Sequence, residues 1–250
     1  MSAADPFSDL AEVEVLPGWR TAQGDHVAGL RITLADGWKT YWRAPGHAGI
    51  PPQFSFTGSA SIGSITPHWP TPEVFDQDGF RSVGYIDSVV IPLTLDHASH
   101  AEPIALSGEI SIGVCEEICI PVHLDFEAVL PPDSQRDTSI AAALIDRPLS
   151  AAEANVGAVT CRIAPISDGL QVTTQIGLPS TGMSEHVVIE TGDPDIWVSE
   201  ADVARSGNQL SATVDMVHSS GSAFALDRSA LRITVLGSDQ AVDIHGCSRS

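Results

Sequence analysis

Two closely spaced cysteines, Cys115 and Cys119, lie between segments that alternate apolar and polar residues with the period of a β-strand. The segments are 104–114 and 120–129, and Pro121 excludes a regular helix across the second one. Two strands joined by a three-residue loop place the cysteines opposite each other, about 4.5–5.5 Å apart between Cα atoms. A disulfide can bridge that distance. The run therefore predicts a β-hairpin with a cysteine pair at its mouth.

A disulfide that closes so short a loop removes little entropy from the unfolded chain, so it is a weak structural staple. The pair is therefore a candidate for redox chemistry. A plain structural disulfide remains an alternative. A copper or zinc site made by the two thiolates with His123 is another, although no second close Cys or His pair completes a tetrahedral set. The spacing disfavours haem attachment and a thioredoxin-type site.

The composition is that of a globular chain: 250 residues, of which 43% are hydrophobic and 18% charged. The 17 prolines and 21 glycines favour many short strands separated by turns. A net charge of −20 repels phosphate backbones, so nucleic acid is excluded as a partner. No apolar run approaches the roughly 20 residues of a transmembrane helix, so we expect no membrane insertion.

The sequence predicts an all-β fold of two antiparallel sandwiches joined by a linker with one short helix. The expected boundaries are 1–130 for the first domain, 131–155 for the linker and 156–250 for the second domain. The helix is expected over 138–149, capped by Asp137 or Thr138. The expected strands are 27–34, 38–42, 53–56, 88–95, 104–114, 120–129, 159–166, 170–177, 186–190, 196–198, 209–217, 223–226 and 231–236.

The other two cysteines, Cys161 and Cys247, lie near the two ends of the second domain. If they pair, the disulfide closes a loop of about 85 residues, which corresponds to about 4 kcal/mol of stabilisation by chain entropy. We therefore predict a structural disulfide between them. Two unrelated buried thiols are the alternative.

Three stretches of the first domain resemble the amino-terminal periplasmic domain of the DsbD thiol-disulfide interchange family, particularly the branch that includes ScsB. They are 37–46 (GWKTYWRAPG) with 49–52 (GIPP), 69–75 (WPTPEVF) leading into Gly84-Tyr85, and 113–115 (GVC) with 119–121 (CIP). The resemblance covers most of residues 10–130. In the second half, Cys161 and the terminal Gly246-Cys247 are similar to the extra β domain of the ScsB branch.

The resemblance implies an immunoglobulin-like fold for both domains and a redox-active pair in which Cys119 attacks the partner and Cys115 resolves. It also implies an aromatic cap loop over the pair, at 75–81. Phe80 is the first choice for the shielding ring and Phe75 the second. No cofactor and no metal are expected.

Four further residues are expected around the pair. The resemblance places Tyr41 and Trp42 in the lining of the site, and core packing is the alternative for both. Glu116 and Glu117 lie inside the loop itself. They either solvate the turn or raise the pKa of the exchanging thiol.

Together these features predict a periplasmic or secreted thiol-disulfide exchange protein, which would make it an oxidoreductase. The small, polar start at 1–6 resembles the stretch after a cleavage site, so we expect a signal peptide to have been removed. The expected partners are periplasmic thioredoxin-like disulfide proteins, with a membrane electron-transfer protein as a further candidate. A copper- or metal-handling module and a purely structural interaction domain remain as alternative functions.

Overall fold

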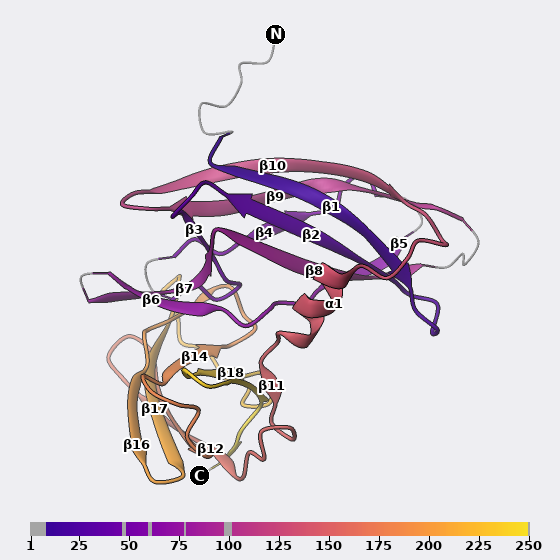
Figure 1. The fold of residues 1–250 in the computed structure, drawn as a ribbon. Helices are drawn as coiled ribbons and strands as arrows, with labels where there is room; N and C mark the ends of the chain where they lie inside the picture. The colour runs from indigo at the N-terminus through magenta and orange to yellow at the C-terminus, as the bar shows by residue number, and fades with distance from the viewer. Residues whose placement is uncertain (1–8, 47–48, 60–61, 78, 98–101, 250) are drawn as a thin grey trace. The chain divides into compact units, whose positions relative to one another are not determined.

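The computed structural model describes residues 9–46, 49–59, 62–77, 79–97 and 102–249, without the side chains of Gln77, Phe80 and His97. The chain divides into two compact units, which Figure 1 shows as a ribbon. Unit 1 comprises Met1–Phe75 and Ser82–Arg147, and unit 2 comprises Asp76–Arg81 and Pro148–Ser250. Within the described residues, no helix has both the length and the apolar character needed to cross a bilayer.

The first sheet of unit 1 is antiparallel and has the strand order β1-β2-β8-β5. Its strands are β1 (Ala11–Arg20), β2 (His26–Leu34), β5 (Ile62–Pro67) and β8 (Ser88–His97). Alternate residues of β2, among them Leu30 and Ile32, are almost completely buried. Period-2 burial of large aliphatic side chains is what fixes the register of such a strand.

The helix α1 (Thr138–Ile145) packs its buried Ile140 against Leu16 and Val27 of this sheet. Asp137 caps it by accepting hydrogen bonds from the amides of Ser139 and Ile140 at 2.7 and 3.1 Å. The short helix predicted over 138–149 is therefore present in the described residues, with Asp137 as its cap, but it ends at Ile145, and Leu149 begins the strand β11 (Leu149–Ser150).

The second sheet of unit 1 has the order β10-β9-β3-β7-β6, and β4 also pairs with β9. Its strands are β3 (Lys39–Tyr41), β4 (Gln53–Ser55), β6 (Glu73–Gln77), β7 (Phe80–Ile86), β9 (Ile104–Cys115) and β10 (Cys119–Leu130). Strands β9 and β10 pair without interruption from Ile104↔Leu130 to Cys115↔Cys119. Ile110, Ile112 and Val114 alternate on the core face of β9 and are buried. Cys115 and Gly113 therefore belong to the opposite face of this sheet.

Unit 2 also consists of two sheets, with the orders β11-β19-β18-β14 and β15-β17-β13-β12-β20, and with β16 paired to β17. Their core contains Val172, Ile176, Leu210, Ile233 and Val235. The strands are β11 (Leu149–Ser150), β12 (Val159–Pro165), β13 (Leu170–Gly177), β14 (His186–Glu190), β15 (Ile196–Val198), β16 (Asp202–Ser206), β17 (Gln209–His218), β18 (Arg232–Leu236), β19 (Ala241–His245) and β20 (Ser248–Arg249).

The predicted fold class, all-β with antiparallel immunoglobulin-like sandwiches, is confirmed; in the described residues only β11–β19 and β12–β20 pair in parallel. Two local expectations were wrong. Residues 223–226 form no strand, because Phe224 and Leu226 pack onto the core of unit 2 from an irregular segment. The expected cap loop over 75–81 is largely the end of β6 and the start of β7.

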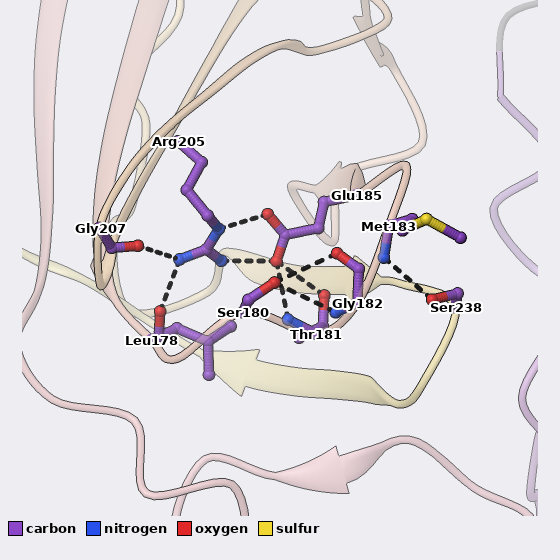
Figure 2. Close-up of polar contacts among 9 residues, drawn as sticks. All are labelled: Leu178, Ser180, Thr181, Gly182, Met183, Glu185, Arg205, Gly207 and Ser238. Carbon is purple, nitrogen blue, oxygen red and sulfur yellow. Dashed lines mark hydrogen bonds and ion pairs between the residues drawn. The ribbon is translucent and has the colours of Figure 1, made fainter.

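A partly buried ion pair fixes the segment that precedes β14 (Figure 2). Arg205 on β16 donates two hydrogen bonds to the Glu185 carboxylate at 2.5 Å and a third to the Leu178 carbonyl at 2.7 Å. Thr181 donates to the same carboxylate from its amide and its hydroxyl, each at 2.9 Å. Burial alone would raise the pKa of Glu185, but the bonds from Arg205 and Thr181 outweigh it and the pKa is lowered. Glu185 therefore stays charged and links three segments of unit 2.

Candidate redox site

The two hairpin cysteines form a disulfide across the last paired position of β9 and β10. Their Cα atoms are 4.2 Å apart. The loop between them is closed by a hydrogen bond from the Glu116 amide to the Ile118 carbonyl, at 3.2 Å. The two cysteines differ sharply in exposure, because Cys115 is 1% exposed whereas Cys119 lies at the surface. A molecule that approaches from solvent can therefore reach Cys119 but not Cys115.

Strand β3 supplies the surroundings of the buried sulfur. Lys39 pairs with Cys115, and Thr40 pairs with Val114. Residues directly opposite each other in a sheet share a face, so the side chains of Lys39 and Tyr41 lie on the same face as the disulfide. Thr40 fixes the pairing from the other face, because its hydroxyl donates a buried hydrogen bond of 2.9 Å to the Gly113 carbonyl.

Tyr41 lies across the strand that carries Cys115. A Cβ atom added at Gly113 would sit 3.0 Å from two atoms of the Tyr41 ring, so only glycine lets the ring approach this closely. The Tyr41 hydroxyl lies 3.0 Å from Cys119 Sγ and 3.1 Å from Cys115 Sγ. Neither sulfur of a disulfide carries a proton, so the hydroxyl is the donor. Burial raises the pKa of Tyr41, which keeps this hydroxyl protonated.

Trp42 is fully buried, and the guanidinium carbon of Arg43 lies 3.7 Å from the centre of its ring. Its amide donates to the Val83 carbonyl at 2.9 Å, which ties the end of β3 to β7. The structure thus places Tyr41, and not its neighbour, in contact with the sulfurs.

Phe75, on β6, contributes a further aromatic ring next to Lys39. The ammonium nitrogen of Lys39 lies 5.1 Å from the centre of the Phe75 ring. Phe80 begins β7, but its side chain lies outside the described residues, so its expected shielding role stays a prediction. Gly79 makes the turn between the two strands, with a φ of +84°.

The three loop residues of the hairpin are exposed: two carboxylates followed by one apolar residue. Glu116 and Glu117 are exposed, and Ile118 has 66% of its surface accessible. A partner that reaches Cys119 must therefore meet two carboxylates and one isoleucine.

The residue that sequence reasoning missed is Lys39. Its side chain is only 7% exposed, and burial lowers its pKa. One signal could have identified it: Lys39 is the only lysine of the chain.

The alternative of a metal site finds no support in the part of the chain that the structure describes. There, no group of three or more His, Cys, Asp and Glu side chains is arranged to hold a metal ion. His123, considered above as a third ligand, has its Nδ1 atom 2.7 Å from the Ser111 hydroxyl and 3.6 Å from Glu109.

Cys161 and Cys247 form a second disulfide, within unit 2. Their Cα atoms are 5.8 Å apart, the sequence separation is 86 residues, and Cys161 is completely buried. This bond joins β12 to the segment between β19 and β20. It differs from the hairpin disulfide both in the length of the loop it closes and in how deeply it is buried.

The hairpin lies inside a segment that matches a known protein family. Residues 12–131 match the family model described as "Thiol:disulfide interchange protein DsbD, N-terminal". Residues 12–131 are a domain of this family. The matched range contains the hairpin, Tyr41, Lys39 and Phe75, and ends one residue after β10. Comparison with curated proteins gave no match.

Among solved structures, the N-terminal periplasmic domain of ScsB from Proteus mirabilis has a TM-score of 0.74 at 23% sequence identity. The match covers 99% of this chain and 97% of that one, so the shared fold extends beyond the DsbD family domain into unit 2. A protein of unknown function from Porphyromonas gingivalis W83 matches over 93% of this chain and 99% of its own, at 10% identity. Its TM-score of 0.23 is too low to indicate a common fold.

Proposed function

We propose that this protein exchanges electrons with partner disulfide proteins through Cys115 and Cys119. One observation carries the proposal: of the two cysteines in the hairpin disulfide, Cys119 is exposed at the surface and Cys115 is only 1% exposed. Thiol-disulfide exchange needs this asymmetry, because a partner attacks or is attacked at one sulfur while the other completes the reaction. Family membership of residues 12–131 supports the same chemistry.

In the reducing direction, the Cys119 thiolate attacks one sulfur of the partner disulfide, and the other partner sulfur leaves as a thiolate. The mixed disulfide is then attacked at Cys119 Sγ by the Cys115 thiolate. The Cys115–Cys119 bond forms, the bond to the partner breaks, and the partner's second sulfur leaves as a thiolate. Two electrons have passed to the partner, and no cofactor takes part. The reverse sequence reduces the hairpin disulfide.

The Tyr41 hydroxyl has a defined role in this scheme. It lies within 3.1 Å of both sulfurs, so it can donate a hydrogen bond to whichever sulfur carries the negative charge. Phe75, together with Phe80 by resemblance, would shield the pair from small oxidants. Glu116 and Glu117 would disfavour a thiolate until a partner covers the loop.

The proposed location is the periplasm, and the proposed partners are thioredoxin-like disulfide proteins and a membrane electron-transfer protein. The support is the ScsB domain of the same fold, which is described as periplasmic. For the second disulfide, Cys161–Cys247, we propose a structural role. The proposed domain division is 1–130, a linker at 131–155, and 156–250.

The test is a trap at each cysteine. With Cys115 replaced by serine, Cys119 can attack a disulfide but nothing resolves the product, so reduced Cys115→Ser should hold a mixed disulfide with oxidised glutathione. Cys119→Ser is the matched control, and we expect it to trap far less because Cys115 is buried. The wild-type pair should equilibrate with a glutathione buffer at a potential above about −300 mV. Equal trapping by both variants, or a pair that stays oxidised in reduced glutathione, would refute the proposal.

A further inference from the structure

The chain carries twelve cationic side chains besides histidine, and eleven of them are arginines. The one lysine is Lys39, which is buried to 93% of its surface. Lysine and arginine are not equivalent when buried, because lysine is a compact charge whose ionisation responds to its surroundings. An exposed surface would accept either residue. The single use of lysine therefore marks a position where the compact ammonium matters.

Its position is fixed by strand pairing. Cys119, Cys115 and Lys39 form one row across β10, β9 and β3, and Ile86 of β7 continues the row. Neighbours in such a row have Cβ atoms about 4.5–5.5 Å apart on one face of the sheet. The Phe75 ring lies 5.1 Å from the ammonium nitrogen and stabilises the cation there. The charge is thus held on the same face as the buried sulfur.

Other polar groups act on the same sulfur. Tyr41, on Lys39's own strand, donates a hydrogen bond to it. Glu116 and Glu117 follow Cys115 in the loop and oppose a negative charge on it. Ile86, on the far side of Lys39, is apolar. Among the described residues of this row, Lys39 is the one cation.

Burial raises the pKa of a thiol and so removes the thiolate that Cys115 needs in order to resolve a mixed disulfide. We propose that the Lys39 ammonium stabilises the Cys115 thiolate and thereby speeds release of the partner. The inference rests on the exchange function proposed above and adds a positioning residue to it. In the step concerned, the Cys115–Cys119 bond forms, the Cys119–partner bond breaks, and the partner sulfur leaves with the electron pair. No further reactant is required.

The direct test is the titration of Cys115 in a Cys119→Ser background, followed by thiolate absorbance. The second disulfide stays intact there, so Cys115 is the only free thiol of the protein. Lys39→Met removes the charge and keeps most of the side-chain length, whereas Lys39→Arg keeps the charge. We expect Lys39→Met to raise the pKa of Cys115 by about one unit or more and Lys39→Arg to restore most of the difference. Equal titration of Lys39→Met and its parent would overturn the inference, as would Lys39→Arg behaving like Lys39→Met.

The kinetic test uses the protein with both cysteines, reduced at the hairpin and mixed with dithiobis(nitrobenzoate). Attack by Cys119 releases a first thionitrobenzoate, and attack by Cys115 on the mixed disulfide releases a second. A rise of one unit in the pKa of Cys115 lowers its thiolate fraction about tenfold, and the higher intrinsic nucleophilicity of that thiolate increases its rate of attack about threefold. We therefore expect Lys39→Met to slow the second release about three- to fourfold. If the wild type gives no second release, the exchange function itself fails. If both proteins release it at one rate, only the role of Lys39 fails.

A third measurement needs no change at Lys39. With ¹³C-labelled lysine, the protein gives one lysine Cε signal, because the chain has one lysine. Interaction between two titrating groups is reciprocal, so in the Cys119→Ser protein this signal should shift with the same midpoint as the Cys115 thiolate absorbance. Cys115→Ser with Cys119→Ser is the control and should lack that step. A lysine signal that ignores the thiol titration would overturn the inference even if Lys39→Met failed to fold.

Discussion

Gly113 offers the sharpest test of how the site is built. A Cβ atom at this position would lie 2.9 Å from Ile50 Cβ and 3.0 Å from both Cδ2 and Cε2 of Tyr41. Gly113 is not one of the described glycines with a positive φ, so an alanine can adopt its backbone conformation without strain. In the folded state, the cost of Gly113→Ala therefore comes from the contact of the added methyl group with the Tyr41 ring and Ile50.

Overpacking by one methyl group in a tight site costs about 1–3 kcal/mol. Replacing glycine by alanine offsets about 0.4–1 kcal/mol of this cost, because alanine lowers the conformational entropy of the unfolded chain. Ile50 is 38% exposed and can move, whereas Tyr41 is 4% exposed and cannot move without a gap. We expect a net loss of about 1–2 kcal/mol and a Tyr41 hydroxyl displaced from the two sulfurs. The hairpin disulfide should then be reduced faster by dithiothreitol.

Urea unfolding followed by tryptophan fluorescence measures the loss of stability, because Trp19, Trp38, Trp42 and Trp69 all lie in unit 1. The loss corresponds to a fall of about 0.5–1 M in the urea midpoint. Gly63→Ala is the matched control, because a Cβ there meets only the exposed Asp96 side chain within 3.4 Å. Tyr41→Phe keeps the ring and removes the hydroxyl. If Gly113→Ala unfolds and is reduced like the parent, the ring does not rest on this strand.

Three more outcomes follow from the structure. The Cys115–Cys119 bond should be reduced by mild dithiothreitol while Cys161–Cys247 persists, since Cys119 is an exposed residue and Cys161–Cys247 closes the long loop. Mass mapping of alkylated peptides checks this, and equal sensitivity of the two bonds would contradict it. Arg205→Leu should destabilise unit 2 by about 3–5 kcal/mol, because it leaves the buried Glu185 charge unpaired. In thermal unfolding, the double variant Arg205→Leu with Glu185→Leu should recover much of this loss, and an unchanged melting temperature in the single variant would refute the role of the pair. Burial lowers the pKa of His186 from 6.5 to about 4, so the stability that depends on its neutral form is present above pH 6.5 and is lost as the pH falls towards 4. Between pH 7 and pH 5 the free energy of unfolding should fall by about 2 kcal/mol. His186→Leu should show a correspondingly weaker pH dependence, and an equal dependence in both proteins would show that His186 does not contribute.

The sequence-based predictions succeeded where the signal is local. Alternation on both sides of Cys115 and Cys119 predicted the hairpin, and the observed register pairs these residues as expected. At 75–81 the family resemblance led us to expect a cap loop. An Asp-Gly pair between short apolar runs is itself a hairpin signal, and the strands β6 and β7 lie on either side of this pair. The same alternation misled at 223–226, because apolar side chains can reach the core from an irregular segment.

The chemistry of the site depends on pairing that no local pattern specifies. Gly113 and Cys115 alternate along β9 like any outward pair, and on their own they would be exposed. They are covered because β3, which lies far away in the sequence, pairs beside β9 and brings Tyr41 and Lys39 onto that face. The hairpin therefore supplies the two sulfurs, whereas β3 supplies the hydrogen bond and the charge that act on them. Transfer of residues 104–130 alone to another sheet would carry the disulfide across but would leave its buried sulfur without either group.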